Sequence, residues 1–359
     1  MGGRIIAKDR YGKTLIMNRF VRLSSEEQHQ YFIEASARMN LSPYIVEKDF
    51  WVCYVLEKLF SVHDLGNSLI FKGGTSLSKA YRLIERFSED IDISIDRNTL
   101  GCDRDGNDPE ANVGSNERQR RIERLSEECR KVVNDILVPE LIALITTALG
   151  TGDDWSLSMD EEDPDFQTIL FAYPTIAASG PRAYIKPAVK IEMGARSDNW
   201  PSERVEIISY VAQHFPEAFD APAFPVKVLA PERTFWEKAT LLHAEHHRPQ
   251  TKAAPNRLSR HYYDVARLIQ AGLGEKAVAG IELLDRVIQH KNIFFRSSWA
   301  SYDTARQGTL RLAPNPDRME PLMEDYERMK DMFFGSKPDF SSIVDILTDW
   351  QDRFNSFGQ

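Results

Sequence analysis

Residues 90–95 alternate strictly between a polar residue and isoleucine. Because the side chains of a β-strand point alternately to its two faces, this pattern predicts a half-buried strand with the isoleucines inside. Asp90 and Asp92 then share the other face. Two like charges so close together are costly unless a cation neutralises them, and carboxylate oxygens are ligands that suit Mg²⁺. The pattern indicates a metal site, and a solvated strand face with ordinary acids is the alternative.

A glycine pair lies just upstream of this strand. Residues 68–72 are typical of a short strand, Gly73 and Gly74 end it, and apolar residues then recur at helical spacing. Glycines let the backbone approach a ligand closely, and the free N–H groups at the start of a helix bind phosphate. An ordinary turn is the alternative interpretation. The candidate phosphate-binding residues are Lys72, Gly73, Gly74, Thr75 and Ser76.

Residues 189–193 alternate in the same way and place Lys190 and Glu192 on one strand face. A neighbouring strand would bring Glu192 beside the two aspartates as a third carboxylate, whereas a Lys–Glu surface pair is the alternative. Together the three features predict a phosphoryl-transfer site, with phosphate at the glycine turn and the acids around metal ions. Catalysis at such a site depends on positioning and on charge neutralisation at phosphorus.

The order of predicted elements favours an α+β fold. Ser24 followed by Glu27 is a capping-box pattern that predicts a helix over 25–39, and Ser42-Pro43 opens a second helix. Residues 151–165 contain seven acids and no base, which predicts a solvated surface connection. Further strands are predicted over 167–173, 184–193 and 204–211, and further helices over 117–149, 232–247, 258–271, 275–291, 318–333 and 340–355.

The patterning changes from mixed to all-helical after Pro231. The sequence therefore predicts an α/β domain with N-terminal helices over 1–228 and a C-terminal helical domain over 229–359. Residues 227–267 hold eight Lys and Arg against four Asp and Glu, which is a local basic zone suited to a triphosphate or an RNA end. His243, His246 and His247 also lie there, but no further ligand follows at a typical zinc spacing, so a histidine-rich helix end is the preferred interpretation.

Composition narrows the class of protein. The chain has 359 residues and a net charge of −9, so it is not a general binder of nucleic acid or membranes. Its three cysteines match no zinc or redox motif and fit a reducing cytosol. The first 15 residues contain no apolar signal segment, and the apolar runs fall short of the ~20 residues that span a bilayer. The expected location is the cytoplasm, without a membrane partner.

Several of these stretches together resemble the AbiEii/AbiGii-type nucleotidyltransferase toxins, a family of the polymerase-β-like nucleotidyltransferase superfamily. Residues 72–81 and 86–94 are similar to the family's central motif, in which an apolar residue and Gly-Gly are followed by Asp90-Ile-Asp92-Ile. Ile191-Glu192-Met193 is similar to the third superfamily motif. Residues 46–51, 233–238 and 260–264 are also similar to family motifs, so the resemblance covers roughly residues 40–270.

The resemblance implies a polymerase-β-like core with a mixed sheet, and it implies roles for single residues. Asp90, Asp92 and Glu192 would hold Mg²⁺, and Lys190 shares the strand face of Glu192. Lys238 would contact the nucleotide phosphates, and Asp264 would be a further carboxylate of the site. Ser88 matches a serine of the active-site motif.

The implied function is that of the toxin of a toxin–antitoxin or phage-defence system. Such an enzyme transfers NMP from an NTP to a hydroxyl, and the resemblance implies RNA such as a tRNA end as acceptor and a cognate antitoxin as partner. A protein hydroxyl is also chemically possible. A γ-phosphoryl transferase and a non-catalytic nucleotide-binding module on the same fold are the alternatives.

Overall fold

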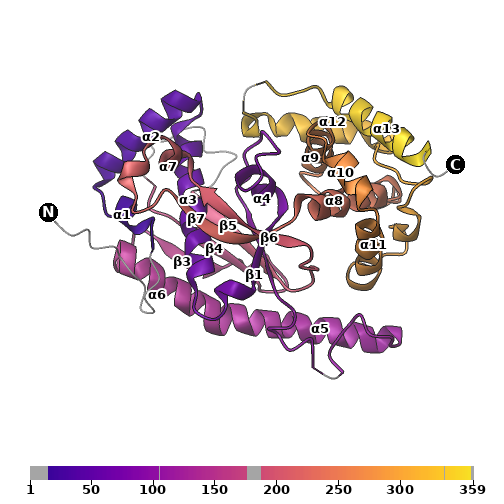
Figure 1. The fold of residues 1–359 in the computed structure, drawn as a ribbon, viewed down its shortest axis with the longest axis horizontal. Coiled ribbons are helices and arrows are strands. Elements are labelled where there is room, and N and C mark those ends of the chain that lie inside the picture. Colours follow the sequence, from indigo (N-terminus) through magenta and orange to yellow (C-terminus); the bar gives the residue numbers. More distant parts are fainter. Residues whose placement is uncertain (1–14, 105, 176–186, 335, 357–359) are drawn as a thin grey trace. The chain divides into compact units, whose positions relative to one another are not determined.

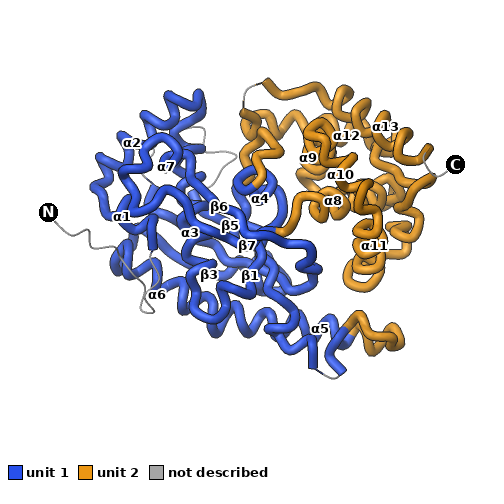
Figure 2. The backbone as a smooth tube through the Cα atoms, viewed as in Figure 1, with its two compact units in different colours: residues 1–80, 89–108, 120–228 blue, residues 81–88, 109–119, 229–359 orange. Residues whose placement is uncertain are grey.

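The computed structural model describes residues 15–104, 106–175, 187–334 and 336–356. It confirms the α+β class, since a mixed sheet with covering helices precedes a run of helices along the chain (Figure 1). The chain divides into two compact units, which Figure 2 shows in two colours. The first unit comprises residues 1–80, 89–108 and 120–228, and the second comprises residues 81–88, 109–119 and 229–359.

Within the described residues, seven strands form one sheet in the order β3-β4-β5-β2-β1-β7-β6. The central strand β2 runs antiparallel to β1 and parallel to β5, so the sheet is mixed. The isoleucines of β2 are fully buried, as their alternation predicts. The strand bounds are β1 Leu69–Lys72, β2 Ile91–Ile95, β3 Ser156–Met159, β4 Thr168–Ala172, β5 Ala188–Gly194, β6 Ser202–Ile208 and β7 Ala223–Leu229.

Helix α3 is buried along most of its length and packs on this sheet. Every residue from Ile45 to Leu59 is buried, and α3 contacts α2, α6, α7 and strand β5. The predicted capping box of α2 is present, because Ser24 and Glu27 bond to each other's backbone N–H. The first unit also contains α1 Asn18–Val21, α2 Ser25–Met39, α3 Pro43–Ser61, η1 Gly66–Ser68, α4 Gly73–Lys79, α7 Tyr210–His214 and η3 Pro216–Ala218.

A long helical stretch spans residues 115–149 and consists of α5 Ser115–Val132, the π-turn η2 Val133–Leu137 and α6 Val138–Leu149. It contains an 18-residue window with a mean hydropathy of 1.7, of which 22% is buried. By length and composition alone, this helix among the described residues is able to cross a membrane, although the core helices of soluble proteins pass the same test. The expected absence of a membrane partner therefore stays a prediction.

In the second unit, α8 packs on α9, α10 and α11, and α9 packs on α12 and α13. Aromatic contacts of Trp236 and Phe235 with Trp350 join α8 to α13, with ring centroids 6.2 and 5.3 Å apart. The elements are α8 Pro231–His246, α9 Ser259–Gln270, α10 Leu273–Ala279, α11 Glu282–Phe294, η4 Tyr302–Thr304, η5 Pro316–Arg318, α12 Met319–Arg328, η6 Lys330–Met332 and α13 Phe340–Ser356.

Two predictions about elements are wrong, and one strand was not predicted. The acidic stretch 151–165 is not only a surface connection, because it contains β3, which pairs antiparallel with β4. The helix predicted over 275–291 is two helices, α10 and α11, separated at Gly280. Strand β7 was not predicted, although it pairs with β1 through Phe71 and Val228. The predicted strand over 184–193 corresponds to β5, while residues 184–186 lie outside the described residues.

Candidate functional site

A row of polar side chains crosses four strands of the sheet at one level. Lys72 of β1 is the register partner of Asp92 in β2, Asp92 is the partner of Glu192 in β5, and Glu192 is the partner of Thr168 in β4. Register partners in neighbouring strands point to the same face of a sheet. The strand pairing therefore brings Glu192 beside Asp92, as the sequence predicts.

The glycine turn touches the second aspartate. Gly73 has φ +80°, and a Cβ at this position would lie 1.9 Å from Asp92 Oδ2. Both the backbone conformation and the close approach require glycine here. The sheet and the start of α4 thus meet at the Asp92 carboxylate, so two motifs separated by 18 residues form one site.

The hydroxyl groups of the turn bond within the protein. The Thr75 hydroxyl donates a hydrogen bond to the backbone oxygen of Asp90, and the Ser76 hydroxyl donates to the backbone oxygen of Gly73 at 2.9 Å. Thr75 thereby fixes the first turn of α4 to the residue that precedes β2. The first N–H groups of a helix have no intrahelical partner, so the backbone N–H groups of Gly73 and Gly74 suit a phosphate oxygen, and phosphate binding at this turn stays a prediction.

Lys190 supplies positive charge among the carboxylates. Its ammonium group lies 3.2 Å from Glu192 Oε1 and 3.5 Å from Asp160 Oδ2. Burial lowers the pKa of Lys190, but the carboxylates of Glu192, Asp160 and Asp90 outweigh this and raise it. The cost of the paired acids is therefore offset in part by a lysine of the same sheet face.

Two of the three predicted carboxylates, those of Asp90 and Asp92, fit a hard cation. Asp90 and Asp92 offer carboxylate oxygens, the ligands that Mg²⁺ prefers. Glu192 is bonded to Lys190 instead, and its side chain is 43% exposed. No group of three or more His, Cys, Asp or Glu residues is arranged to hold a metal in the described part of the chain. Mg²⁺ binding at Asp90 and Asp92 stays a prediction, and Glu192 would first have to leave Lys190.

Two consecutive residues of α3, Lys48 and Asp49, form ion pairs with residues next to the candidate site. The sequence predicted no role for either residue. Lys48 forms a buried ion pair with Glu89, the residue before Asp90. Asp49 accepts a hydrogen bond from Lys79 of α4 at 2.5 Å and one from the backbone N–H of Tyr210 at 2.7 Å. One pair therefore fixes the start of β2, and the other fixes α4. The available signal was the charged run Glu47-Lys48-Asp49 between apolar residues of the predicted helix.

Lys238 and Asp264 belong to the second unit, where they contact each other. The Lys238 ammonium lies 3.0 Å from Asp264 Oδ2 and 3.1 Å from His261 Nδ1. Arg86 binds the same carboxylate in a bidentate manner, with both nitrogen–oxygen distances at 2.8 Å. Arg86 stands two residues before Ser88, which is half-buried and also belongs to the second unit. The sequence predicted no role for Arg86.

The electrostatics of this cluster follow from its burial. Burial alone would raise the pKa of Asp264, but Arg86 and Lys238 outweigh it and hold that pKa far below 3.8. Burial lowers the pKa of Lys238, and Asp264 opposes this shift. Asp264 therefore stays ionised and serves as the anchor of two cations. Joint action of this cluster with the carboxylates of the sheet stays a prediction.

The histidines at the end of α8 form hydrogen bonds within the protein. His243 Nδ1 accepts the backbone N–H of Arg311 at 3.0 Å, and Nε2 lies 3.1 Å from the backbone oxygen of Ser301 and from the Thr304 hydroxyl. Both ring nitrogens are used, so His243 has no nitrogen left for a metal. This agrees with the interpretation that was preferred over a zinc site.

Comparisons with known proteins bear on the family. Residues 54–355 match the family model described as nucleotidyl transferase AbiEii toxin, type IV TA system. No curated protein matches. Among solved structures, MenT4, a nucleotidyltransferase toxin from Mycobacterium tuberculosis H37Rv, matches with a TM-score of 0.42 and 17% identity over 93% of this chain and 97% of that one. The family match covers most of the chain and includes every carboxylate of the site, and the chain therefore belongs to the AbiEii nucleotidyltransferase toxins of type IV toxin–antitoxin systems.

Proposed function

We propose that the chain transfers NMP from an NTP to a hydroxyl of RNA, such as a tRNA end, with Mg²⁺ and with release of pyrophosphate. The observation that carries this proposal is the contact between the Asp92 carboxylate and the Gly73 backbone. It joins a metal-binding type of residue to a helix start whose N–H groups suit phosphate. Membership of a nucleotidyltransferase family supports the class of reaction.

Each residue has a role in this reaction. The backbone of Gly73 and Gly74 holds the triphosphate, with Lys72 beside it. Asp90 and Asp92 hold Mg²⁺, which neutralises phosphate charge when it is bound. A bond forms between the acceptor oxygen and the α-phosphorus while the bond from that phosphorus to pyrophosphate breaks. The hydroxyl proton passes to Glu192, and Lys238, held by Asp264, neutralises the pyrophosphate.

The cellular setting follows from the family in part. As a toxin of a type IV system, the chain has a cognate antitoxin. We place both in the cytoplasm and assign the pair to phage defence. Unrestrained transfer onto cellular RNA then accounts for toxicity.

The decisive experiment uses purified protein, Mg²⁺, total cellular RNA and each α-³²P-labelled NTP in turn. Asp92→Asn removes the charge at the glycine contact, and Asp153→Asn makes the same chemical change at an exposed residue. We expect labelled RNA from the wild type and from Asp153→Asn. Asp92→Asn should lose at least about 100-fold of the rate, because removing one group that stabilises charge in the transition state costs that much.

The alternatives predict other products. Label on protein alone would move the acceptor to a side-chain hydroxyl. A γ-phosphoryl transferase would release nucleoside diphosphate and label the acceptor only from γ-labelled NTP, and a non-catalytic module would bind nucleotide without any product. Equal labelling by Asp92→Asn and the wild type would contradict the proposed site.

A further inference from the structure

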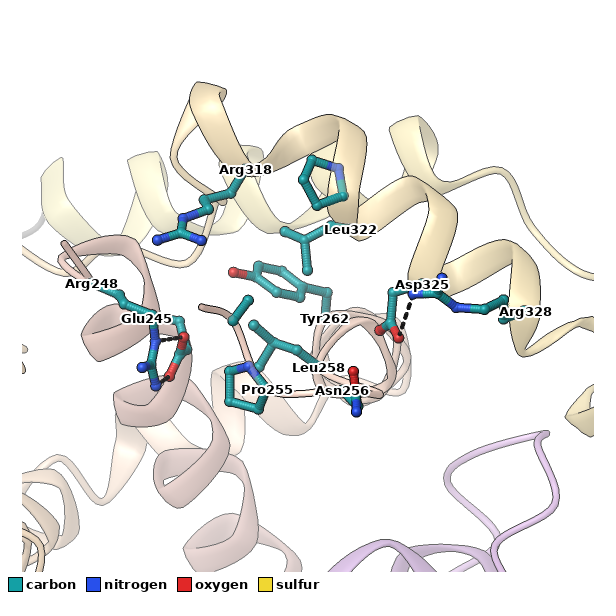
Figure 3. A pocket seen from close by; sticks show the side chains of 12 residues that line it. Glu245, Arg248, Pro255, Asn256, Leu258, Tyr262, Arg318, Leu322, Asp325 and Arg328 are labelled. Atoms are coloured by element: carbon teal, nitrogen blue, oxygen red, sulfur yellow. Dashed lines mark hydrogen bonds and ion pairs between the residues drawn. The ribbon is translucent and has the colours of Figure 1, made fainter. Parts of the chain in front are cut away.

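The second unit contains a cavity of about 170 Å³ between residues 254–258 and helix α12 (Figure 3). One side of it belongs to the basic zone predicted at residues 227–267, to which the proposed chemistry assigns only Lys238, and the other side belongs to residues 318–328. An apolar cavity of about 150 Å³ holds a benzene molecule, so this volume suits one planar ring system. The cavity is also open to solvent on one side, since Pro255 and Asn256 of its lining are exposed.

The floor of the cavity is apolar and carries one polar group. Leu258, Leu322 and Tyr262 line it and are 6%, 3% and 1% exposed. Figure 3 shows the Tyr262 ring between the two leucines, with its hydroxyl directed into the pocket on the side of Arg318. No hydrogen-bond partner of this hydroxyl is found among the residues that the structure describes. This hydroxyl is not among the fully buried polar atoms that lack a partner, so it reaches the pocket and is able to bond to a ligand there.

The charge at the cavity is not balanced. Arg248 is paired with Glu245 through two bonds of 2.6 and 2.7 Å, and Arg328 lies 3.7 Å from Asp325. Arg318 donates from Nη2 to the backbone oxygens of Pro249 and Lys252, at 2.8 Å each. No carboxylate pairs with Arg318 in the described part of the chain. Its Nε and Nη1 N–H groups remain to donate charge-assisted hydrogen bonds to a phosphate.

Aromatic and basic side chains continue beside the cavity. The guanidinium of Arg248 lies 4.3 Å from the ring centre of Trp299, and the Lys252 ammonium lies 5.7 Å from it. Stacking surfaces interleaved with cations are typical of sites that bind single-stranded nucleic acid. An isolated anion would use Arg318 but not the apolar floor, and an apolar ligand would leave the cation uncompensated.

We propose that this cavity binds one nucleotide of the RNA acceptor, with its base against Leu258, Leu322 and Tyr262 and its phosphate at Arg318. The choice of RNA as ligand rests on the proposed function. The apolar floor and Arg318 by themselves indicate a ligand with a flat ring attached to an anion.

The test measures binding of a 5′-fluorescein-labelled 12-nucleotide single-stranded RNA by fluorescence anisotropy, on the full chain without NTP. Arg318→Gln should weaken binding by about tenfold, the effect of losing a charged hydrogen bond. The slope of log K against log salt should also become shallower by about 0.7, the value for one phosphate contact on a single strand. Arg353→Gln, at a 63% exposed side chain of α13, is the matched control and should change neither quantity.

Tyr262→Phe is the second variant, because it removes only the hydroxyl and leaves the packing intact. We expect about fivefold weaker binding, since one neutral hydrogen bond is lost, with the salt slope unchanged. A general loosening of the unit would not separate the two variants in this way. If Arg318→Gln binds RNA like Arg353→Gln, or if inorganic phosphate competes as well as AMP does, the cavity is not a nucleotide site.

The result of the RNA-binding test can be distinguished from the result of the nucleotidyl-transfer test. Binding in this assay requires neither the sheet carboxylates nor NTP, so Asp92→Asn should bind RNA like the wild type. Labelled RNA together with Arg318-independent binding would overturn only the cavity proposal. Arg318-dependent binding without any transfer would overturn only the proposed reaction.

Discussion

Gly73 is the residue on which the geometry of the site depends most directly. Its positive φ and its contact with Asp92 both exclude a side chain. Gly73→Ala must therefore displace either the carboxylate or the turn. We expect the rate of nucleotidyl transfer to fall by about 100-fold or more, because a shift of about 1 Å at a reacting group has that effect.

Gly272→Ala is the matched control for this substitution. Gly272 also has a positive φ, at +74°, but a Cβ there would meet nothing within 4 Å. Both substitutions place a side chain in the left-handed backbone region, which lowers the free energy of unfolding by about 1–2 kcal/mol in each variant. Only Gly73→Ala should lose activity. Equal rates in the two variants would mean that the Asp92 contact is unimportant.

Asp264 illustrates how burial and pairing define the role of a carboxylate. The sequence places it among the catalytic acids. In the structure it is fully buried and bonded to Arg86 and Lys238, and its pKa is held far below 3.8. A carboxylate so strongly stabilised in its ionised form is a poor proton acceptor. Its position suits the orientation of two cations instead.

Helix α3 orients helix α4 through one buried ion pair. Asp49 and Lys79 are 2% and 9% exposed, and their charged groups bond across the two helices. Asp49→Asn leaves a buried ammonium without its counter-charge. We expect the free energy of unfolding to fall by about 3–5 kcal/mol in chemical denaturation.

Two controls accompany this variant. Glu127→Gln removes an exposed partner of Arg130 in α5 and should leave the free energy of unfolding nearly unchanged, because solvent screens an exposed ion pair. The double variant Asp49→Asn, Lys79→Met removes both charges and should recover much of the loss. If Asp49→Asn were no more costly than Glu127→Gln, the pair would not hold α4 in place.

The success of the element predictions depended on whether the signal was local. The capping box, the isoleucine alternation and the proline at the start of α3 are local signals, and each produced the expected element. Strand β3 is four residues within an acidic stretch and is stabilised by pairing with β4. Strand β7 carries a proline and is held by β1. Long-range pairing, which periodicity does not contain, decided these two strands.

The stability of the whole chain should depend on pH through its buried histidines. Burial and the neighbouring His247 lower the pKa of His243 from 6.5 to about 4. Below pH 6.5 the unfolded chain takes up a proton that the folded chain excludes, so this contribution is complete above pH 6.5 and declines towards pH 4. Burial also holds the pKa of His261 well below 6.5, with the same sign.

Urea midpoints at a series of pH values between 7.5 and about 4.5 test this linkage. The wild-type midpoint should decrease as the pH falls. His243→Gln should be less stable at neutral pH, since it loses the bonds to Ser301 and Arg311, but its midpoint should fall less steeply with acid. His63→Gln, at a 45% exposed side chain, serves as the control and should retain the wild-type slope. A flat wild-type profile would contradict the prediction.

The sequence by itself determined the fold class and the family and predicted the chemistry of the motif residues, because alternation, glycine pairs and acid spacing are properties of neighbours along the chain. It also indicated that Glu192 lies beside Asp92. Only the tertiary structure decided that Arg86 and Lys238 share Asp264, and that Lys48 and Asp49 fix the start of β2 and helix α4. These contacts join residues far apart in the chain, and their strength comes from the burial that folding creates.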